Sequence, residues 1–314
     1  MKPIRIASRA SKLALVQSNY ILKLIQDINP GISISIVKVT TEGDRNRADF
    51  LYKSESVGYF TSEVEKAVLD GRADLAVHSL KDLPTSLTPG LQIAAIPKRE
   101  LVSDALITKY TVNSLNELPP GTVVGTSSLR RISQLKHFRN DLKCVPLRGN
   151  VETRANKVDG GQIDAAVMAC AGLNRLGLSD KISVVLPPEQ FITAPGQGAL
   201  AVQIRTNDTE LAELVSQLDD KVTRITVEAE RHVLAIMQGG CSIPLGVYAK
   251  IVNDSLVMNA MIADINGINL IKRSKTSPVN QSLDCAQQLA DELLKSGGRK
   301  ILEQIRNDQN GLRS

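Results

Sequence analysis

The amino-acid sequence predicts two α/β domains followed by a small α+β domain. Its 314 residues are more than one ordinary domain usually holds, and two or three domains fit this length. Short β-rich runs alternate with helical patterns through the first two thirds of the chain, which is typical of largely parallel sheets. From Thr223 onward the pattern changes to one long helix, several alternating strands and a final helix. This change favours a separate C-terminal domain with an antiparallel sheet.

The first domain is expected to begin with a strand at 4–7 and a helix at 13–26. Its further elements are a strand at 32–39, a helix at 62–69 and strands at 74–79 and 91–96. The loop TEGDR at 41–45 follows the strand at 32–39.

The same order restarts after the charged segment PKRELVSD at 97–104, where a second domain is expected to begin. Its elements are strands at 122–125, 143–147 and 164–169, and helices after Ser128 and at 151–157. A further β-like run at 199–204 follows the segment PGQG, and helical patterning resumes near Asp208. Two α/β domains joined by paired crossovers explain this order.

The composition excludes several classes of protein. Hydrophobic residues make up 42% and charged residues 23%, which is ordinary for a soluble globular protein. Aromatic residues make up only 3%, and the net charge of +5 is spread along the chain, so we expect no nucleic-acid partner. No stretch is apolar for the length of a membrane span, and the first residues lead directly into a strand without a signal peptide. We therefore expect a cytoplasmic protein without a membrane partner.

The segment AVHSLKDLP at 76–84 ends an apolar strand with charged residues. Charged groups at the end of a parallel strand lie where α/β proteins open their binding crevice, which makes Lys81 and Asp82 candidates for a functional site. The alternative is an ordinary exposed ion pair between these two residues. His78, in the middle of the strand, is better explained as a packed histidine.

A second candidate site follows the strand that ends at Gly125. Thr126, Ser127 and Ser128 lead into a helix, and such a junction offers backbone N–H groups, hydroxyl donors and the positive end of a helix dipole to a carboxylate or phosphate. The alternative is a plain serine N-cap followed by surface arginines.

Arginine recurs after the ends of the predicted strands. Planar guanidinium groups suit bidentate carboxylate binding, so a crevice lined in this way would hold a ligand with many carboxylates. Any one of them could instead be a surface residue. These arginines are Arg9, Arg130, Arg131, Arg148, Arg154 and Arg175.

Cys241 differs from the other three cysteines because it lies in the glycine-containing turn GGCSIP at the end of a helix. Glycines allow a ligand to approach closely, and a thiol on a loop is open to covalent attachment. Cys144, Cys170 and Cys285 are better explained as small buried hydrophobes. The four cysteines are far apart and form no CxxC pair, so no metal site is expected.

In this order, the motifs closely resemble those of the hydroxymethylbilane synthases, also called porphobilinogen deaminases, over essentially the whole chain. The matching segments are IASRASKLAL, TEGD, ADLAVHSLKDLP, GTSSLRR, LRGNVETR, AGLNRLGL, APGQGAL, AER and GGCSIPLG. The resemblance implies two domains like type II periplasmic binding proteins, with a hinge and an active-site cleft, and a third domain that carries the cofactor cysteine. The domains would comprise 1–98 with 198–218, then 103–193, and finally 222–314.

The resemblance also implies the reaction. Four porphobilinogen molecules would be deaminated and joined head to tail on a dipyrromethane cofactor, which a thioether attaches to Cys241. The enzyme would be a monomer and would pass linear hydroxymethylbilane to a downstream synthase.

The resemblance assigns roles to particular residues. Asp82 matches the catalytic aspartate, which would stabilise the cation formed when porphobilinogen loses ammonia. The residues matched to cofactor binding are Lys81, Thr126, Ser127, Ser128, Arg130, Arg131, Arg148 and Arg154. The residues matched to substrate binding are Arg9, Ser11, Arg175 and Gln197.

One segment departs from the family pattern. A mobile lid usually reads KVGGKGLFxKE in the family, whereas this chain reads KSESVGYFTSE. Lys53 and Phe60 match, but Val57 replaces a lysine, and this leaves the role of the lid open. A smaller departure is Gln238, where glutamate usually precedes GGC.

Two alternative functions remain. One is a non-catalytic anion-binding module, which would share the two-domain architecture but require neither Asp82 nor Cys241. The other is a divergent paralogue with altered elongation, which the changes in the lid leave open.

Overall fold

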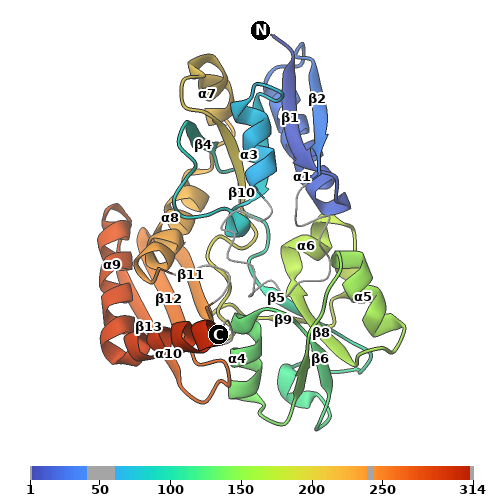
Figure 1. The fold of residues 1–314 in the computed structure, drawn as a ribbon, viewed down its shortest axis with the longest axis vertical. Helices are drawn as coiled ribbons and strands as arrows, with labels where there is room; N and C mark the ends of the chain where they lie inside the picture. Colours follow the sequence, from blue (N-terminus) through green and yellow to red (C-terminus); the bar gives the residue numbers. More distant parts are fainter. Residues whose placement is uncertain (1, 41–60, 239–242, 312–314) are drawn as a thin grey trace. The chain divides into compact units, whose positions relative to one another are not determined.

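The computed structural model describes residues 2–40, 61–238 and 243–311. The chain divides into two compact units, coloured along the sequence in Figure 1. Unit 1 comprises Met1–Leu101 and Gly198–Arg224, and unit 2 comprises Val102–Gln197 and Ile225–Ser314. The chain therefore passes from one unit to the other after Leu101, after Gln197 and after Arg224.

Unit 1 is built on one five-stranded sheet with the order β2-β1-β3-β10-β4. Strands β1, β2 and β3 are parallel, whereas β10 runs antiparallel to both β3 and β4. The carboxyl ends of β1 and β3 therefore lie at the same edge of the sheet. The strands are β1 (Ile4–Arg9), β2 (Ile34–Val39), β3 (Leu75–Ser79), β4 (Leu91–Ala95) and β10 (Leu200–Arg205).

Three helices flank this sheet: α1 (Lys12–Ile28), α3 (Ser62–Leu69) and α7 (Thr209–Ser216). Helix α1 begins at the N-cap Ser11, whose hydroxyl accepts a hydrogen bond from the Ala14 N–H. Its side chains Ile21 and Ile25, one helical turn apart, are fully buried against the strands. The long helix α8 (Lys221–Ile236) begins in unit 1 and continues into unit 2.

The first sheet of unit 2 has the order β7-β6-β8-β5-β9 and repeats the plan of unit 1. Three parallel strands are again followed by an antiparallel strand, here β5, which pairs with β8 and β9. In each sheet the antiparallel strand, β5 or β10, comes directly after a passage from the other unit, which confirms the predicted paired crossovers. The strands are β5 (Asp104–Thr108), β6 (Val123–Gly125), β7 (Lys143–Val145), β8 (Ala165–Ala169) and β9 (Val184–Leu186). The helices between them are α4 (Leu129–Phe138), α5 (Val151–Asp159) and α6 (Cys170–Arg175).

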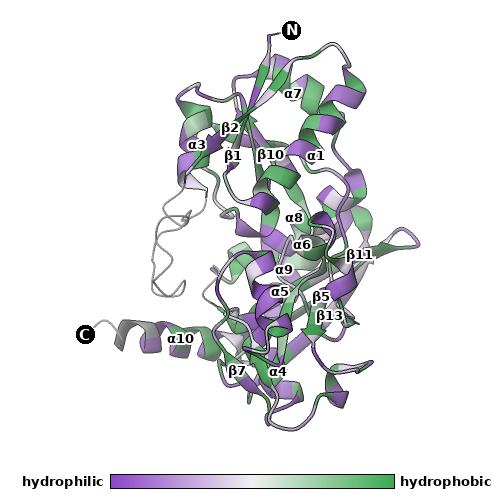
Figure 2. Ribbon diagram, turned by 90° about the vertical axis from the view of Figure 1, so that its right-hand side faces the viewer, coloured by the Kyte–Doolittle hydropathy of each residue, from purple (hydrophilic) through white to green (hydrophobic). Residues whose placement is uncertain are grey.

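The C-terminal part of unit 2 is a three-stranded antiparallel sheet covered by helices. Its strands are β11 (Leu245–Val252), β12 (Ser255–Ala263) and β13 (Leu270–Pro278), and its helices besides α8 are α9 (Ser282–Leu293) and α10 (Arg299–Gly311). Helix α10 is amphipathic and shows both hydrophobic and hydrophilic colours in Figure 2. Its apolar side chains Leu302 and Ile305 lie in one hydrophobic core with Met237, the residue directly after α8.

The hairpin between β12 and β13 packs closely on α4 of the neighbouring sheet. The His137 ring Nδ1 donates to the Gly267 carbonyl oxygen at 3.0 Å, and Lys136 Nζ donates to the Asn266 side-chain oxygen at 3.1 Å. Gly267 has φ +70°, and a Cβ atom at this position would overlap the Ser133 carbonyl oxygen. Glycine is therefore required here by both conformation and space.

The predicted fold class is confirmed, and most predicted elements match the observed ones. The elements that the sequence did not predict are β5, β9, α6 and α10. Both missed strands are short, and their pairing partners lie far away in the sequence. Among the described helices, none is long and apolar enough to cross a membrane. The predicted boundaries of three separate domains stay a prediction.

We predict that Gly267→Ala destabilises the protein more than Gly161→Ala does. The two glycines have nearly the same φ, +70° and +69°, but a Cβ atom on Gly161 would meet nothing within 4 Å. Both substitutions should lower the free energy of unfolding by about 1 kcal/mol, because alanine is strained in the left-handed conformation. Gly267→Ala should lower it by a further ~1–3 kcal/mol, because the added Cβ atom overpacks the contact. Urea denaturation would measure both losses. Equal losses would show that the hairpin can shift on α4 at no cost.

Candidate functional site

Asp82 lies on a short 3-10 turn, Leu80–Asp82, that follows β3 without interruption. The leucines on either side, Leu80 and Leu83, are buried, and the Leu80 N–H donates to the Ala199 carbonyl oxygen at 3.0 Å. Asp82 itself is exposed. The sequence thus places a carboxylate in solvent on a backbone that both of its neighbours anchor. Lys81, on the same turn, is half-buried.

Arg9 and Ser11 follow the adjacent parallel strand β1. Because β1 and β3 are neighbours, the segment from Arg9 to Ser11 and the turn that bears Asp82 leave the sheet at the same edge. Both Arg9 and Ser11 are half-buried. Within unit 1, the structure therefore brings the predicted catalytic residue to the same edge as two of the predicted substrate-binding residues.

A hydrogen-bonded chain of polar side chains links β3, which carries the Asp82 turn, to β10 and α3. The His78 Nε2 lies 3.1 Å from the Gln203 side-chain oxygen, the Gln203 amide nitrogen donates to Glu65 at 2.9 Å, and the Thr88 hydroxyl donates to the same carboxylate. Since the Gln203 nitrogen is the donor to Glu65, its oxygen must accept from His78 Nε2. Burial lowers the pKa of His78 to about 4, although the hydrogen bond to Gln203 acts in the opposite direction. His78 is thus a neutral, packed histidine near pH 7, as the sequence analysis expected.

In unit 2 the predicted carboxylate-binding residues follow three adjacent parallel strands, β7, β6 and β8. Their carboxyl ends therefore lie at one edge of the sheet. The Thr126 N–H donates to the Val145 carbonyl oxygen at 2.9 Å, and the Ser127 hydroxyl both accepts from the Leu147 N–H and donates to the Leu147 carbonyl oxygen. These bonds join the segment after β6 to the segment after β7. Ser128 is the N-cap of α4, and its side chain makes no capping bond.

Arg148, Arg154 and Arg175 all follow these strand ends and are half-buried. Arg154 Nε donates to the Gly149 carbonyl oxygen at 2.7 Å, which folds the side chain back over the start of α5. Gly149 has φ +110°, and a Cβ atom there would lie 2.8 Å from the Thr153 methyl carbon. Arg175 is the last residue of α6.

Arg130 and Arg131 are not surface residues. Both are buried at the start of α4 and bind the fully buried carboxylate of Asp104, the first residue of β5. Arg130 Nη1 donates to one oxygen of Asp104 at 2.9 Å, and Arg131 Nη2 donates to the other at 2.6 Å. Burial alone would raise the pKa of Asp104, but the two guanidinium charges and their hydrogen bonds outweigh burial and hold this pKa well below its usual range.

Gln197 completes the same cluster. It is fully buried, and its amide nitrogen lies 2.9 Å from an oxygen of Asp104 and 2.7 Å from the Val102 carbonyl oxygen. Arg130 Nη1 also donates to the Ile192 carbonyl oxygen at 2.8 Å. The predicted residues Arg130, Arg131 and Gln197 are thus gathered around one carboxylate. Sequence analysis missed Asp104, because its only signal is an acidic residue at the end of a charged segment.

Three predicted residues, Cys241, Lys53 and Phe60, lie outside the described residues. The described residue that comes before the Cys241 segment is Gln238, which has φ +48° and accepts a hydrogen bond from Arg306 at 3.0 Å. Met237 beside it is fully buried.

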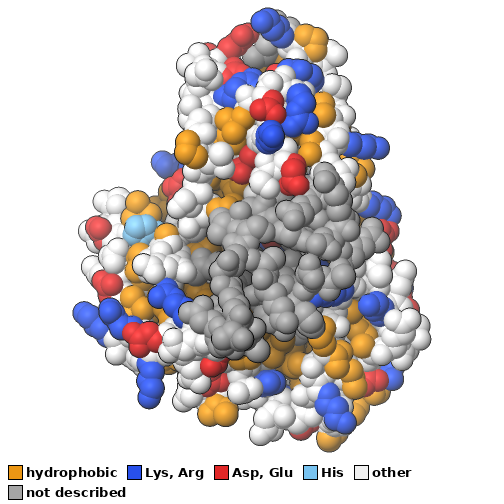
Figure 3. Space-filling model, in the orientation of Figure 1, with side chains coloured by type: hydrophobic (Ala, Val, Ile, Leu, Met, Phe, Trp, Pro, Cys, Tyr) orange, Lys and Arg blue, Asp and Glu red, His pale blue; other side chains and the backbone are white. Residues whose placement is uncertain are grey.

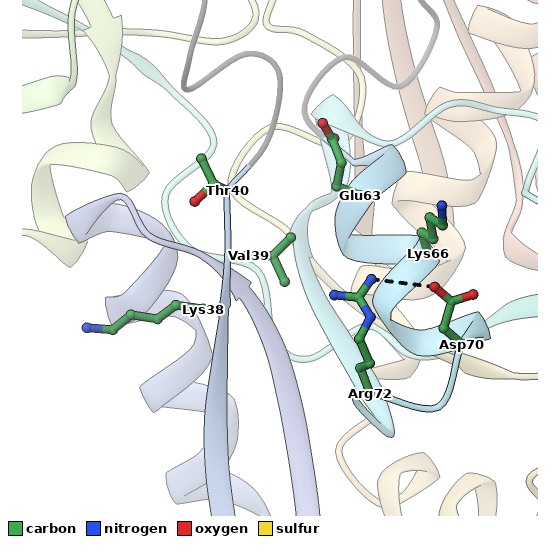
Figure 4. Close-up of a pocket in the computed structure, with 7 residues that line it drawn as sticks. All are labelled: Lys38, Val39, Thr40, Glu63, Lys66, Asp70 and Arg72. Carbon is green, nitrogen blue, oxygen red and sulfur yellow. Dashed lines mark ion pairs between the residues drawn. The ribbon is translucent and has the colours of Figure 1, made fainter.

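A hollow in unit 1 contains none of the predicted site residues. Its lining, shown in Figure 4, carries charges of both signs, and the Arg72 and Asp70 side chains form an ion pair at 3.6 Å. Lys38 points away from this pair. Figure 3 shows lysine and arginine side chains scattered over the visible described face instead of gathered in one patch. The described residues also hold no cluster of three or more His, Cys, Asp or Glu side chains that could bind a metal ion.

Comparison with known proteins identifies the family. Residues 4–213 match the family model "Porphobilinogen deaminase, dipyromethane cofactor binding domain", and residues 224–295 match "Porphobilinogen deaminase, C-terminal domain". The porphobilinogen deaminase of Maridesulfovibrio salexigens is 44% identical over 97% of this chain and 99% of its own length. That of Syntrophobacter fumaroxidans is 41% identical over 96% of this chain and 97% of its own. The chain belongs to the porphobilinogen deaminase family.

This family catalyses hydroxymethylbilane synthesis, so the chain has the activity of a transferase in tetrapyrrole biosynthesis and uses a dipyrromethane cofactor. Solved structures of periplasmic binding proteins are more distant. Substrate binding domain 2 of GlnP from Lactococcus lactis is 15% identical, with a TM-score of 0.42 over 69% of this chain and 88% of its own. A periplasmic sulfonate-binding protein of Methylobacillus flagellatus is 16% identical, with a TM-score of 0.38 over 74% of this chain and 68% of its own.

The residues of unit 2 fit the porphobilinogen deaminase cofactor, whose pyrroles carry carboxylates. Arg131 Nε is buried and has no hydrogen-bond partner among the described residues. A buried donor of this kind is costly unless a ligand or water satisfies it. In addition, the two guanidinium groups at Asp104 carry one positive charge more than the carboxylate balances.

We predict that Asp104→Asn lowers the free energy of unfolding by about 3–5 kcal/mol, because it leaves two guanidinium groups buried without a counter-charge. Asp159→Asn is the matched control, since it removes the carboxylate of a partly exposed pair with Lys181. That loss should stay below about 1 kcal/mol. Urea denaturation of both variants would give the values. Similar small losses in both would mean that Arg130 and Arg131 find other acceptors.

Proposed function

We propose that Asp82 is the catalytic carboxylate for the condensation of porphobilinogen, and that Cys241 carries the dipyrromethane cofactor through a thioether. The observation that carries the first assignment is the geometry of the turn. Asp82 is exposed, while Leu80, two residues before it, and Leu83, directly after it, are buried. A carboxylate that is both accessible and fixed in position suits electrostatic catalysis, because no free energy is lost in orienting it during the reaction.

The chemistry suits a carboxylate. Loss of ammonia from porphobilinogen leaves positive charge on the pyrrole and its methylene carbon, and a nearby carboxylate stabilises that charge. The same group can accept a hydrogen bond from a pyrrole N–H and assist proton transfer. A neutral amide retains the shape of the side chain but loses the charge.

The arginines at the carboxyl edge of β7, β6 and β8 would hold the acetate and propionate groups. When bound, the cofactor supplies the pyrrole to which the first substrate unit is joined. Arg148 and Arg154 are half-buried at that edge and would bind its carboxylates directly, together with Lys81 and the segment from Thr126 to Ser128. Arg131 would contribute its buried Nε, whereas Arg130 would act mainly by fixing Asp104.

The growing chain of pyrroles would be bound by Arg9, Ser11 and Arg175. Gln197 differs from these, because its amide nitrogen is held by Asp104 and the Val102 carbonyl oxygen. This supports a role in orienting the arginine cluster toward substrate. The cytoplasmic location, the monomeric state and the transfer of product to a downstream synthase stay predictions, as does a role for Lys53 and Phe60 in a lid.

We predict that the intact mass of the purified protein exceeds the sequence mass by one dipyrromethane, and that Cys241→Ser abolishes this excess. Cys144→Ser is the matched control, since Cys144 is a half-buried thiol on β7. It should keep the adduct. An active enzyme whose mass equals that of the bare chain would refute the assignment of Cys241.

We predict that Asp82→Asn folds normally and lowers kcat by about 10²–10³-fold, because one preorganised charge at the reacting centre has an effect of that size. Asp27→Asn, which removes an exposed carboxylate near the end of α1, should leave kcat unchanged. Porphobilinogen consumption measured on holoenzyme would give both values. Parental turnover by the Asn variant would reduce Asp82 to a surface charge.

A further inference from the structure

Helix α1 is joined to the catalytic turn by a hydrogen bond between side chains. The Gln17 amide nitrogen donates to the Ser79 hydroxyl oxygen at 2.9 Å, across 62 positions of sequence. Ser79 is the last residue of β3, and the turn Leu80–Asp82 follows it directly. The bond therefore holds the backbone three residues before the Asp82 carboxylate.

Gln17 occupies a position that an apolar residue would fill more easily. It is 4% exposed and lies one turn before Ile21 on the face of α1 that packs against the sheet. Burying a side-chain amide costs free energy unless its polar atoms are hydrogen-bonded. Packing of the helix alone does not account for glutamine at this point, whereas the contact with Ser79 does.

The bond complements the other contacts of the turn. Successive side chains of a strand point to opposite faces, so His78 reaches Gln203 on one side of the sheet while Ser79 reaches α1 on the other. The Leu80 N–H is held by the Ala199 carbonyl oxygen. Gln17 thus supplies a restraint on the face of the sheet opposite the His78 chain.

Helix α1 also begins at the proposed substrate-binding segment. Ser11 is its N-cap, and Gln17 lies in the second turn of the same helix. A helix of this length is stiff, so a bond at Gln17 fixes the distance between its N-terminal end and the strand that carries the catalytic turn. Substrate recognition at Arg9 and Ser11 and the position of Asp82 are then set by one rigid element.

We propose that Gln17 is a positioning residue for the condensation reaction, which acts through Ser79 to hold the Asp82 carboxylate in register with substrate bound at the start of α1. The proposal rests on the proposed role of Asp82. It assigns to Gln17 no contact with substrate. Its loss should lower kcat, while KM should change little because the substrate-binding groups themselves are retained.

The test uses purified holoenzyme and measures kcat and KM for porphobilinogen together with the thermal midpoint. Gln17→Met keeps the length and apolar stem of the side chain but cannot donate to Ser79. We expect kcat to fall by about 10-fold to 100-fold, the range that misplacement of a reacting group by about 1 Å produces, with KM within about twofold of the parent. Ser79→Ala should cause a similar loss, and the double variant should lose no more than either single variant.

Two further variants provide controls. Ser18→Ala removes the adjacent hydroxyl on the same helix, which is fully buried and makes no hydrogen bond to any described residue, so its kcat should equal the parental value. Ser79→Thr keeps the hydroxyl on a strand position that suits a β-branched residue, and it should retain more activity than Ser79→Ala.

The outcomes separate this inference from the proposed function. A lower thermal midpoint with parental kcat in Gln17→Met, while Asp82→Asn shows its expected loss of kcat, would overturn the inference alone and make Gln17 a purely structural contact. Additive losses in the double variant would also overturn it. If Asp82→Asn turned over at the parental rate, the proposed function itself would fall, whatever Gln17→Met showed.

Discussion

The ion cluster at Asp104 is the interaction on which the arrangement of unit 2 depends. Two guanidinium groups and one carboxylate are all removed from water, and Arg130 and Arg131 are neighbours in sequence whose like charges would repel each other without Asp104 between them. Burying such an ion cluster costs free energy unless the charges are well placed and fully hydrogen-bonded. The Asp104 oxygens meet this need by accepting from both arginines and from Gln197. The Asp104 carboxylate thereby ties the first residue of β5 to the start of α4 and to the end of the segment after β9.

Unit 1 fixes its proposed catalytic group by different means. Asp82 is exposed and belongs to no buried cluster, so its position depends on the backbone around it. Buried leucines, the bond from Leu80 to Ala199 and the side chains of His78 and Ser79 restrain that backbone. The contrast is consistent with the chemistry. Groups proposed to hold carboxylates can be rigid and partly enclosed, whereas a carboxylate proposed to meet a new substrate unit at each cycle must remain accessible.

The sequence predicted the repetitive parts of the structure and missed what depends on distant partners. The order of strands and helices followed from periodicity, because side-chain burial repeats with the geometry of each element. Strand β5 was missed because its identity depends on pairing with β8, some sixty positions later. The functional role of Arg130 and Arg131 at a helix start stays a prediction, and nothing nearby in sequence indicates that Asp104 lies between their guanidinium groups. The same holds for Gln17, since a glutamine in an apolar helix does not reveal its partner.

The contacts of Gln197 give the segment PGQG a structural role. The chain passes between the units directly before Val102 and directly after Gln197, and these two passages are bound to each other on both sides of the boundary. In unit 2 the Gln197 amide donates to the Val102 carbonyl oxygen, and in unit 1 the Glu100 N–H donates to the Gly198 carbonyl oxygen at 3.2 Å. Gly198 has φ +87°, and a Cβ atom there would lie 2.5 Å from the Glu100 carbonyl oxygen, so the close approach requires glycine. Because Gln197 also holds Asp104, the paired passages and the arginine cluster share one side chain.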